Sequence, residues 1–264
     1  MATNSKIEWT HHTMNPWWGC TRVSPGCAHC YAETLAHRYG HNVWGKGKAR
    51  RPASEKVWAE PVKWNKAAAM AGERHRVFCS SMADVFDEGA PEGARERLWA
   101  LIRSTPGLDW LLLTKRPENF QAMLPPDWGD GWANVWLGVS AENQDLLHKR
   151  VSILRHVPAV VRFVSAEPLL SELDFERGGW ALTRQLKSPE GKIYPPIHWV
   201  IVGGESGHGA RPMDLRWARI IRDQCRADGV AYFFKQLGGA RDKGGDLESI
   251  PEDLRIREFP KVGQ

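Results

Sequence analysis

The chain has 264 residues and a mass of 29.8 kDa, with 42% hydrophobic and 25% charged residues. This length suits one large α/β domain, and the ordinary composition excludes a fibrous or disordered protein. Lys and Arg exceed Asp and Glu by a net charge of +5, which permits a polyanionic partner without indicating a dedicated nucleic-acid-binding protein. We find no run of ~18 apolar residues and no secretory leader pattern, so we expect a cytoplasmic protein with no membrane partner.

From residue 77 onward, short apolar runs alternate with helical patterns. Strands are predicted at residues 77–79, 108–113, 134–139, 160–164, 199–202 and 230–234, with an earlier strand near Trp17-Trp18. Helices are predicted at residues 31–39, 95–104, 145–156 and 214–227. Runs that are apolar throughout are typical of parallel strands covered on both faces. The pattern therefore predicts a single α/β domain over residues 1–264, built as a parallel β/α barrel.

Three segments lie outside this pattern. Residues 40–64 are basic and irregular, and residues 171–196 carry several Gly and Pro, so we interpret both as insertions. The tail, residues 238–264, is rich in Gly and charge, and we expect it to wrap the barrel or to stay partly mobile.

Five cysteines do not form a disulfide framework, because three crowd together while Cys79 and Cys225 stand alone. Cys20, Cys27 and Cys30 have the spacing C-x6-C-x2-C on a loop within residues 15–31. Three thiolates can hold three corners of a [4Fe-4S] cubane and leave the fourth iron open to a ligand, the position that S-adenosylmethionine chelates.

A structural zinc site is the alternative, because C-x2-C is also half of a zinc knuckle and His29 or His37 could supply a fourth ligand. The position of the cysteines in the chain favours an iron-sulfur cluster over zinc. The cysteines follow the first predicted strand, at the end of a barrel where enzymes place their active sites.

Polar and charged residues follow each predicted strand, and in a barrel these would converge on one mouth. Helix caps and turns would explain any one of them, but burying so many charges without ligands or partners would be costly. They are Ser80, Ser81, Asp84, Lys115, Arg116, Ser140, Glu142, Ser165, Glu167, Glu205, Lys235 and Gln236.

Several blocks resemble a known family. They are Asn15-Pro16-Trp17-Trp18-Gly19-Cys20, Leu113-Thr114-Lys115-Arg116-Pro117, Trp136-Leu137-Gly138-Val139-Ser140, Val164-Ser165-Ala166-Glu167-Pro168-Leu169 and Val202-Gly203-Gly204-Glu205-Ser206. Together with the cysteine spacing, they resemble the phage- and bacterium-encoded three-cysteine-motif proteins, a domain of unknown function with radical-SAM-like character. The resemblance implies a radical-SAM-type partial or near-complete TIM (β/α) barrel, a [4Fe-4S] cluster and S-adenosylmethionine as radical source.

Roles follow from that resemblance. Cys20, Cys27 and Cys30 are the expected metal ligands, and the expected cofactor contacts are His29, Ser80, Ser81, Ser140, Glu142, Ser165, Glu167 and Gly203. Lys115, Glu205 and Lys235 are the catalytic candidates, and Asp84, Arg116, Arg211 and Gln236 the substrate-binding candidates. A reductant such as flavodoxin or ferredoxin is an expected partner, in a bacterial or phage-infected host cell.

The substrate stays open at this point. The phage association of the family, the basic charge and the Trp-bearing insertions favour a modified base, for example hypermodified thymine in phage DNA. One alternative is a lyase that repairs a DNA photoproduct. Another is a non-catalytic iron-sulfur or zinc module that binds nucleic acid or protein.

Overall fold

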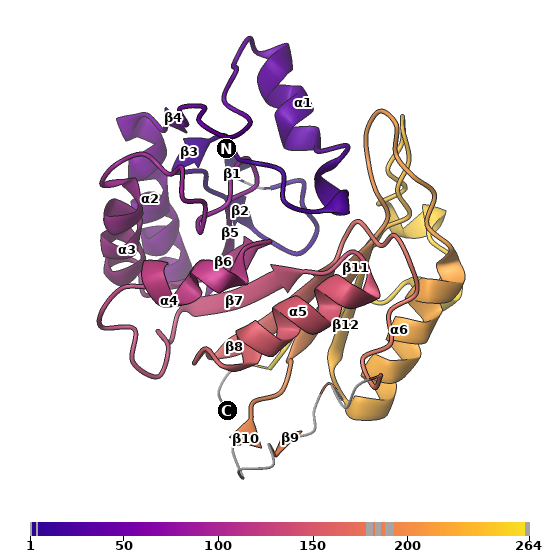
Figure 1. The fold of residues 1–264 in the computed structure, drawn as a ribbon. Helices are drawn as coiled ribbons and strands as arrows, with labels where there is room; N and C mark the ends of the chain where they lie inside the picture. Colours follow the sequence, from indigo (N-terminus) through magenta and orange to yellow (C-terminus); the bar gives the residue numbers. More distant parts are fainter. Residues whose placement is uncertain (1, 4, 178–181, 183–185, 188–192, 262–264) are drawn as a thin grey trace. The chain divides into compact units, whose positions relative to one another are not determined.

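The computed structural model describes residues 2–3, 5–177, 182, 186–187 and 193–261 (Figure 1). The chain divides into two compact units: unit 1 comprises Met1–Val23 and Cys30–Trp136, and unit 2 comprises Ser24–His29 and Leu137–Gln264. The predicted fold class is confirmed: the chain is α/β, a partial β/α barrel of mainly parallel strands. That the whole chain acts as one domain stays a prediction.

Unit 1 is built on a run of strands in which β1 pairs antiparallel with β2, β2 parallel with β5, and β5 parallel with β6. Helices α2 and α3 lie side by side in this unit, and α2 packs against β5 and β6 (Figure 1). The elements of unit 1 are β1 (Ala2–Thr3), β2 (His12–Thr13), β3 (Trp17–Trp18), α1 (Tyr31–Arg38), β4 (Arg51–Pro52), α2 (Glu55–Ala71), β5 (His75–Cys79), α3 (Ala94–Ser104), β6 (Leu108–Thr114) and α4 (Phe120–Met123).

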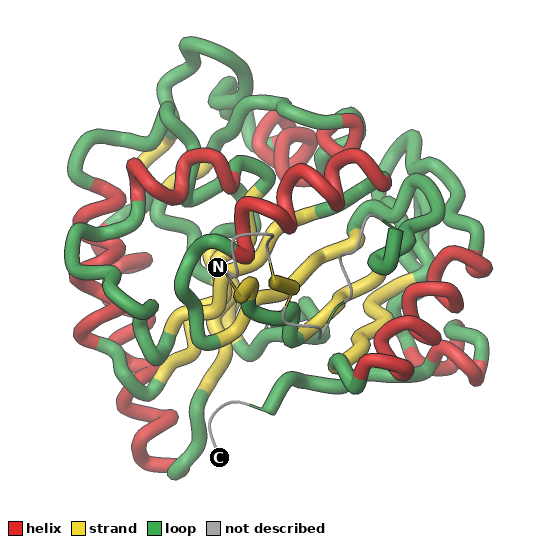
Figure 2. Tube along the Cα trace, turned by 60° about the horizontal axis from the view of Figure 1, so that its bottom comes forward, coloured by secondary structure: helices red, strands yellow, loops and turns green. Residues whose placement is uncertain are grey.

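Unit 2 contains three parallel strands in the order β8-β11-β12, with α5 against β8 and α6 against β11 and β12 (Figure 2). The boundary between the two units falls inside strand β7 (Val135–Ser140), between Trp136 and Leu137. The other elements are α5 (Gln144–Arg155), β8 (Val161–Ala166), β9 (Leu186–Lys187), β10 (Ile193–Tyr194), β11 (Trp199–Gly203), α6 (Leu215–Asp228) and β12 (Ala231–Gln236).

The six strands predicted from residue 77 onward are all present, because their side chains are buried along nearly their whole length. The earlier strand differs from the prediction. Trp17-Trp18 does form β3, but β3 pairs antiparallel with β4 in a separate two-stranded sheet. The strand that lies parallel to β5 is β2, only two residues long and too short to give a sequence pattern.

The proposed insertion at residues 40–64 is only partly irregular, because its last ten residues begin helix α2. Trp58, Pro61, Trp64 and Ala68 recur every three or four residues and form the buried face of this helix. Pro61 lies inside this helix, although a proline lacks the backbone N–H that an interior helical position donates. Much of the other proposed insertion, residues 171–196, lies outside the described residues.

The described part of the tail runs along β12. The Phe234 backbone N–H donates to the Ile256 carbonyl at 2.8 Å, and the Glu258 N–H donates to the Tyr232 carbonyl at 2.9 Å. Phe259 adds a ring contact to Trp199, with centroids 5.4 Å apart. These residues of the tail therefore complete the packing of unit 2.

Gly138 in β7 is required by a close approach within unit 2. A Cβ at this position would lie 2.3 Å from the ring of Phe163, which is fully buried in β8. The glycine of the Trp136-Leu137-Gly138 block is therefore explained by packing.

We predict that Gly138→Ala lowers the free energy of unfolding by about 1–3 kcal/mol, because the added methyl group must displace a buried ring. Urea unfolding measures this loss. Phe163→Leu is the matched second variant, because the smaller side chain leaves room for the added methyl group. The double variant should therefore lose less unfolding free energy than the sum of the two single losses. Simple additivity would contradict the packing explanation.

Three histidines gather at the start of β2 and β5 in unit 1. His12 stacks on Trp64 with centroids 4.4 Å apart, and its Nε2 lies 3.2 Å from Nδ1 of His75. Burial, with His75 as a second cause, lowers the pKa of His12 to about 4. Burial, followed by the charges of Arg76 and His75, lowers the pKa of His11 to about 4 as well. The folded chain therefore holds both rings neutral at pH values where unfolded histidine, with a pKa of about 6.5, takes up a proton.

We predict that acid destabilises the chain through this cluster. Between about pH 6.5 and pH 4 the unfolded state binds more protons, so the contribution of these neutral rings is present above that window and is lost as the pH falls through it. His12→Phe keeps an aromatic ring on Trp64 and should make the unfolding free energy less steep in pH, by no more than about 1.4 kcal/mol per pH unit. The exposed His208→Phe serves as control, and equal slopes in all three proteins would refute the assignment.

Candidate functional site

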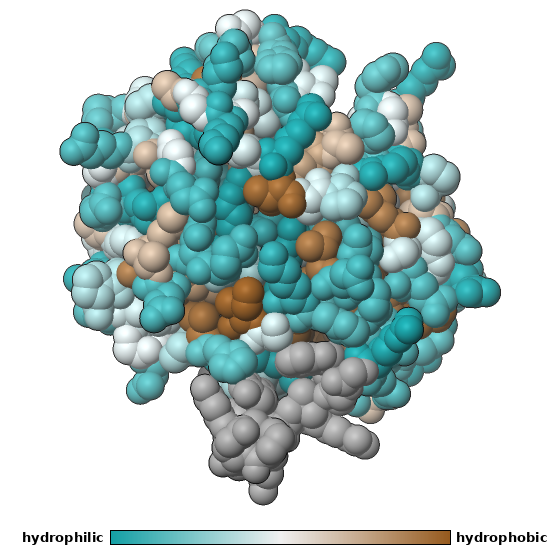
Figure 3. Space-filling model, in the orientation of Figure 1, coloured by the Kyte–Doolittle hydropathy of each residue, from teal (hydrophilic) through white to brown (hydrophobic). Residues whose placement is uncertain are grey.

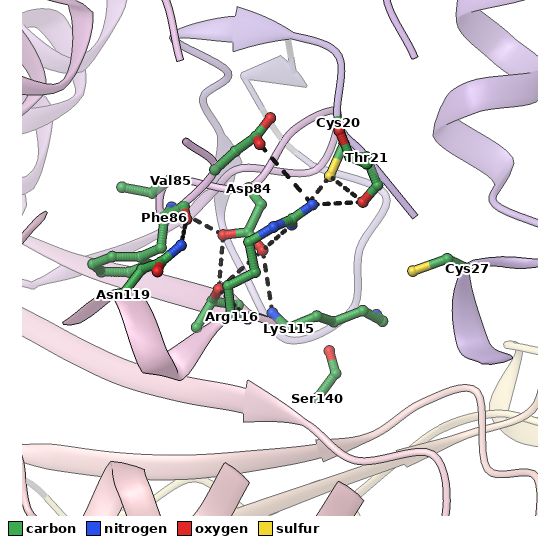
Figure 4. Close-up of polar contacts among 12 residues, drawn as sticks. Cys20, Thr21, Cys27, Asp84, Val85, Phe86, Lys115, Arg116, Asn119 and Ser140 are labelled. Atoms are coloured by element: carbon green, nitrogen blue, oxygen red, sulfur yellow. Dashed lines mark hydrogen bonds and ion pairs between the residues drawn. The ribbon is translucent and has the colours of Figure 1, made fainter. Parts of the chain in front are cut away.

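Cys20 lies two residues after the end of β3, beside the guanidinium group of Arg116 (Figure 4). Arg116 Nη1 donates to Cys20 Sγ at 3.4 Å, and Arg116 Nη2 donates to the Thr21 carbonyl at 2.5 Å. Burial, followed by the charge of Asp84, raises the pKa of the Cys20 thiol to about 12, against the opposing effect of Arg116. The thiol is therefore protonated at neutral pH, and binding a metal would release that proton.

Asp84 holds Arg116 in place from the loop after β5. Its carboxylate accepts hydrogen bonds from Arg116 Nη1 at 3.0 Å, from Thr114 Oγ1 at 2.7 Å and from the Lys115 backbone N–H at 3.2 Å (Figure 4). Arg116 is 3% exposed and Asp84 5% exposed, so this is a buried ion pair. The end of β6 and the loop after β5 are thus fixed to each other beside Cys20.

A second buried pair lies next to the first. Arg50 Nε donates to Asp87 Oδ2 at 2.7 Å, and Arg50 Nη2 donates to Thr21 Oγ1 at 2.7 Å. Asp87 also lies 4.0 Å from Arg116. Thr21 is therefore held by both arginines, through its carbonyl and its hydroxyl.

Ser80 and Ser81 follow β5, as the sequence predicted, and Asn15 organises this turn. Asn15 Oδ1 accepts from the Met82 backbone N–H at 2.7 Å, and Asn15 Nδ2 donates to Ser81 Oγ at 3.0 Å. Tyr31, at the start of α1, donates its hydroxyl to the Ser81 carbonyl at 2.8 Å. Ser80 is buried, with its hydroxyl 3.3 Å from the thiol of Cys79.

In unit 2, the segment Ser24–His29 is held by Glu142, which is fully buried. Ser24 Oγ donates to Glu142 Oε1 at 2.7 Å, and Arg150 Nη1 donates to Glu142 Oε2 at 2.8 Å. A Cβ at Gly26 would lie 2.4 Å from Glu142 Oε1, so a side chain there would collide with the carboxylate. Cys27 lies in this segment, with Sγ 3.7 Å from Ser24 Oγ.

The same segment is held at its other end by Glu205. His29 Nδ1 donates to Glu205 Oε2 at 3.0 Å, and the Arg211 side chain donates to both carboxylate oxygens. Arg211 also donates to the Pro25 carbonyl at 2.9 Å. Although partial burial favours the neutral acid, hydrogen bonds from Arg211 and His29 lower the pKa of Glu205 to about 2. The carboxylate is therefore charged at any physiological pH.

A third group in unit 2 joins the ends of β8 and β12. Lys235 Nζ donates to Glu167 Oε1 at 2.5 Å, and Gln236 Nε2 donates to the same oxygen at 3.3 Å and to the Gly204 carbonyl at 3.0 Å. Gly203 lies beside Glu167, which would be 3.2 Å from a Cβ added at that position.

The predicted site residues therefore fall into groups within each unit. Unit 1 has two groups: Cys20 with Asp84, Lys115 and Arg116, and Ser80 with Ser81. Unit 2 has three groups: His29 with Glu205 and Arg211, Ser140 with Glu142 through Arg150, and Glu167 with Lys235 and Gln236. Ser165 is buried, and its carbonyl accepts from the Ala141 N–H at 2.9 Å. The cofactor, catalytic and substrate roles given to these residues stay predictions.

Sequence reasoning missed Asn15, Ser24, Arg50, Asp87 and Arg150. Arg50 stands in a basic segment and resembled a surface charge, and Arg150 directly follows the exposed Lys149 in helix α5. Asn15 and Ser24 border the cysteines, so their position was the one available signal.

The cysteines suit an iron-sulfur cluster by their chemistry. Cys20, Cys27 and Cys30 form no disulfide and are partly exposed, whereas Cys79 and Cys225 are buried. Within the described ranges, no three His, Cys, Asp or Glu side chains are already gathered as a metal site. Among the same residues, no helix is long and apolar enough to cross a membrane.

The model of a family described as a protein of unknown function, DUF5131, matches residues 4–257. The chain belongs to this family. No curated protein matches its sequence.

Solved structures similar to this DUF5131 protein include two of spore photoproduct lyase. One is a mutant with bound AdoMet and dinucleoside spore photoproduct, 13% identical with a TM-score of 0.49, and the other is a mutant at 15% identity and 0.49. Each match covers 84% of this chain and 62% of the lyase chain, so the chain spans less than two thirds of the length of these relatives.

We predict that Asp84→Asn lowers the free energy of unfolding by about 3–5 kcal/mol, because buried Arg116 then loses its hydrogen-bonded carboxylate and keeps only Asp87, 4.0 Å away. Asp127→Asn is the matched control. It removes the partner of Arg103 in an ion pair whose side chains are 53% and 55% exposed, and it should cost less than about 1 kcal/mol. Denaturant titrations compare the two, and similar losses would mean that burial of the Asp84 pair does not matter.

Proposed function

We propose that this protein is a radical S-adenosylmethionine enzyme whose [4Fe-4S] cluster is held by Cys20, Cys27 and Cys30. The observation that supports it is the cysteine set. Three partly exposed cysteines that form no disulfide lie within eleven residues, and three thiolates leave one iron of a cubane open. Cluster and S-adenosylmethionine together would supply a 5′-deoxyadenosyl radical, and an electron donor such as flavodoxin or ferredoxin would supply the reductant.

The protein's own residues would fix the ligands and tune them. Arg116 donates a hydrogen bond to Cys20 Sγ, and such bonds to ligand sulfurs are one of the factors that set a cluster's reduction potential. Glu142 and Glu205 hold the segment that carries Cys27. In addition to the contacts proposed below, Arg116, Glu142 and Glu205 would position the cysteines, and Asp84 would hold Arg116.

For the cofactor we propose contacts at the strand ends. Ser80 and Ser81 would face the amino group, Ser140 and Glu142 the ribose or carboxylate, and His29 the adenine. Ser165, Glu167 and Gly203 would complete this set. Lys115, Glu205 and Lys235 are the proposed catalytic groups, and Asp84, Arg116, Arg211 and Gln236 the proposed substrate contacts. The proposed substrate is a modified base in DNA.

We predict that protein purified without oxygen and supplied with iron and sulfide binds about four irons per chain. With S-adenosylmethionine and dithionite it should form 5′-deoxyadenosine. Cys27→Ala should bind less iron and form no 5′-deoxyadenosine, because one ligand is lost. Iron and sulfide analysis and product chromatography measure both.

Cys225→Ala is the matched control, because Cys225 is a fully buried thiol of α6 remote in sequence from the loop. It should keep both the iron and the product. A wild-type protein that binds iron but does not cleave S-adenosylmethionine would contradict radical chemistry. Binding of zinc alone would favour the structural zinc site.

A further inference from the structure

Residues 34–54 contain five Lys or Arg and no Asp or Glu, and the charge of this segment equals the net charge of +5 of the whole chain. The five are Arg38, Lys46, Lys48, Arg50 and Arg51. Arg50 is buried with Asp87, so four of these cations are free to act at the surface. The segment belongs to unit 1, where it connects α1 to α2.

The buried side chain of Arg50 holds the loop in this segment through backbone hydrogen bonds. Arg50 Nη1 donates to the carbonyls of Val43, Gly45 and Lys48, at 3.0, 3.1 and 3.0 Å. Val43 and Trp44 are buried in a small core with Ala32 and Ala36 of α1. The loop is therefore ordered before any ligand arrives, which lowers the entropic cost of binding.

The lysines of the loop point outward from this fixed base. Lys46 and Lys48 alternate with Gly45 and Gly47, whose φ angles of 112° and 73° allow a turn that other residues rarely adopt. Both lysines are exposed. Like Arg38 and Arg51, they form no ion pair with any carboxylate that the structure describes. The surface around α1 is accordingly hydrophilic in Figure 3.

Aromatic rings lie close to Arg51, and the exposed Tyr39 directly follows Arg38 in the chain. Tyr39 is 62% exposed, and its ring centroid lies 6.1 Å from that of Trp18. His41 meets the same indole edge-on at 5.8 Å, and the Arg51 guanidinium lies 5.9 Å from its centroid. Rings flanked by unpaired cations are the combination by which proteins bind single-stranded nucleic acid, with bases stacked on the rings and phosphates near the cations.

We propose that Trp18, Tyr39 and His41, with Arg38, Lys46, Lys48 and Arg51, form a binding surface for single-stranded DNA. The choice of DNA rests on the function proposed above, in which a DNA base is the substrate. A duplex would offer its phosphates to the cations but would keep its bases stacked away from Tyr39. An acidic polypeptide would match the charge and leave the rings unused.

The test is binding of a labelled single strand of about 16 nucleotides, followed by fluorescence anisotropy over a range of salt concentrations. Lys46→Ala/Lys48→Ala should weaken binding about tenfold and reduce the slope of log K against log salt by about 1.4, because two phosphate contacts are lost. Lys66→Ala/Lys149→Ala removes the same charge from exposed positions outside the segment and should leave both quantities unchanged.

A second pair of variants tests stacking. Tyr39→Ser should weaken binding about tenfold with the salt slope unchanged, and Tyr39→Phe should bind like the wild type. Unchanged thermal unfolding in every variant shows that the fold is kept. Equal losses in the two lysine pairs, equal affinity for duplex, or equal affinity for polyglutamate would overturn the proposal.

The assay contains no S-adenosylmethionine and no reductant. Failure of radical chemistry therefore leaves the binding result untouched. Failure of binding in turn leaves the 5′-deoxyadenosine result untouched.

Discussion

The buried charges around Thr21 are the constraint on which unit 1 depends. Arg116 and Arg50 each bring a guanidinium group out of water, and Asp84 and Asp87 compensate them. Buried pairs of this kind contribute little net stability, but each partner is costly to leave alone. The network therefore acts by fixing one arrangement. It joins the end of β6, the loop after β5 and the residue that follows Cys20.

Unit 2 uses carboxylates for the same purpose. Glu142 and Glu205 each receive hydrogen bonds from the segment Ser24–His29 and from an arginine of their own unit. Segments of this kind, rich in Gly and Pro, have few apolar side chains to bury. Charge-assisted hydrogen bonds take the place of a hydrophobic anchor, and they fix direction as well as position.

The strands from residue 77 onward were predictable because continuous apolar runs leave few other options. Strand β2 was not predictable, since two residues are too few to show an alternating pattern. Helix α2 was missed because its first ten residues were interpreted as part of an irregular insertion. The three cysteines stood out by spacing alone. Their supporting residues did not, because Arg50 in the sequence looks like any surface arginine and its partner Asp87 is 37 residues away.

The segment that holds Lys46 and Lys48, which contains no Asp or Glu, makes the distribution of charge along the chain uneven. The formal charges of the residues outside 34–54 sum to zero. The net charge of +5 therefore equals the charge of one segment that makes up about a twelfth of the chain. A polyanion approaching at low ionic strength experiences a torque on the protein as well as an attraction. Encounters would then be oriented before contact, with the Tyr39 face leading, and the association rate would fall as salt shortens the range of that field.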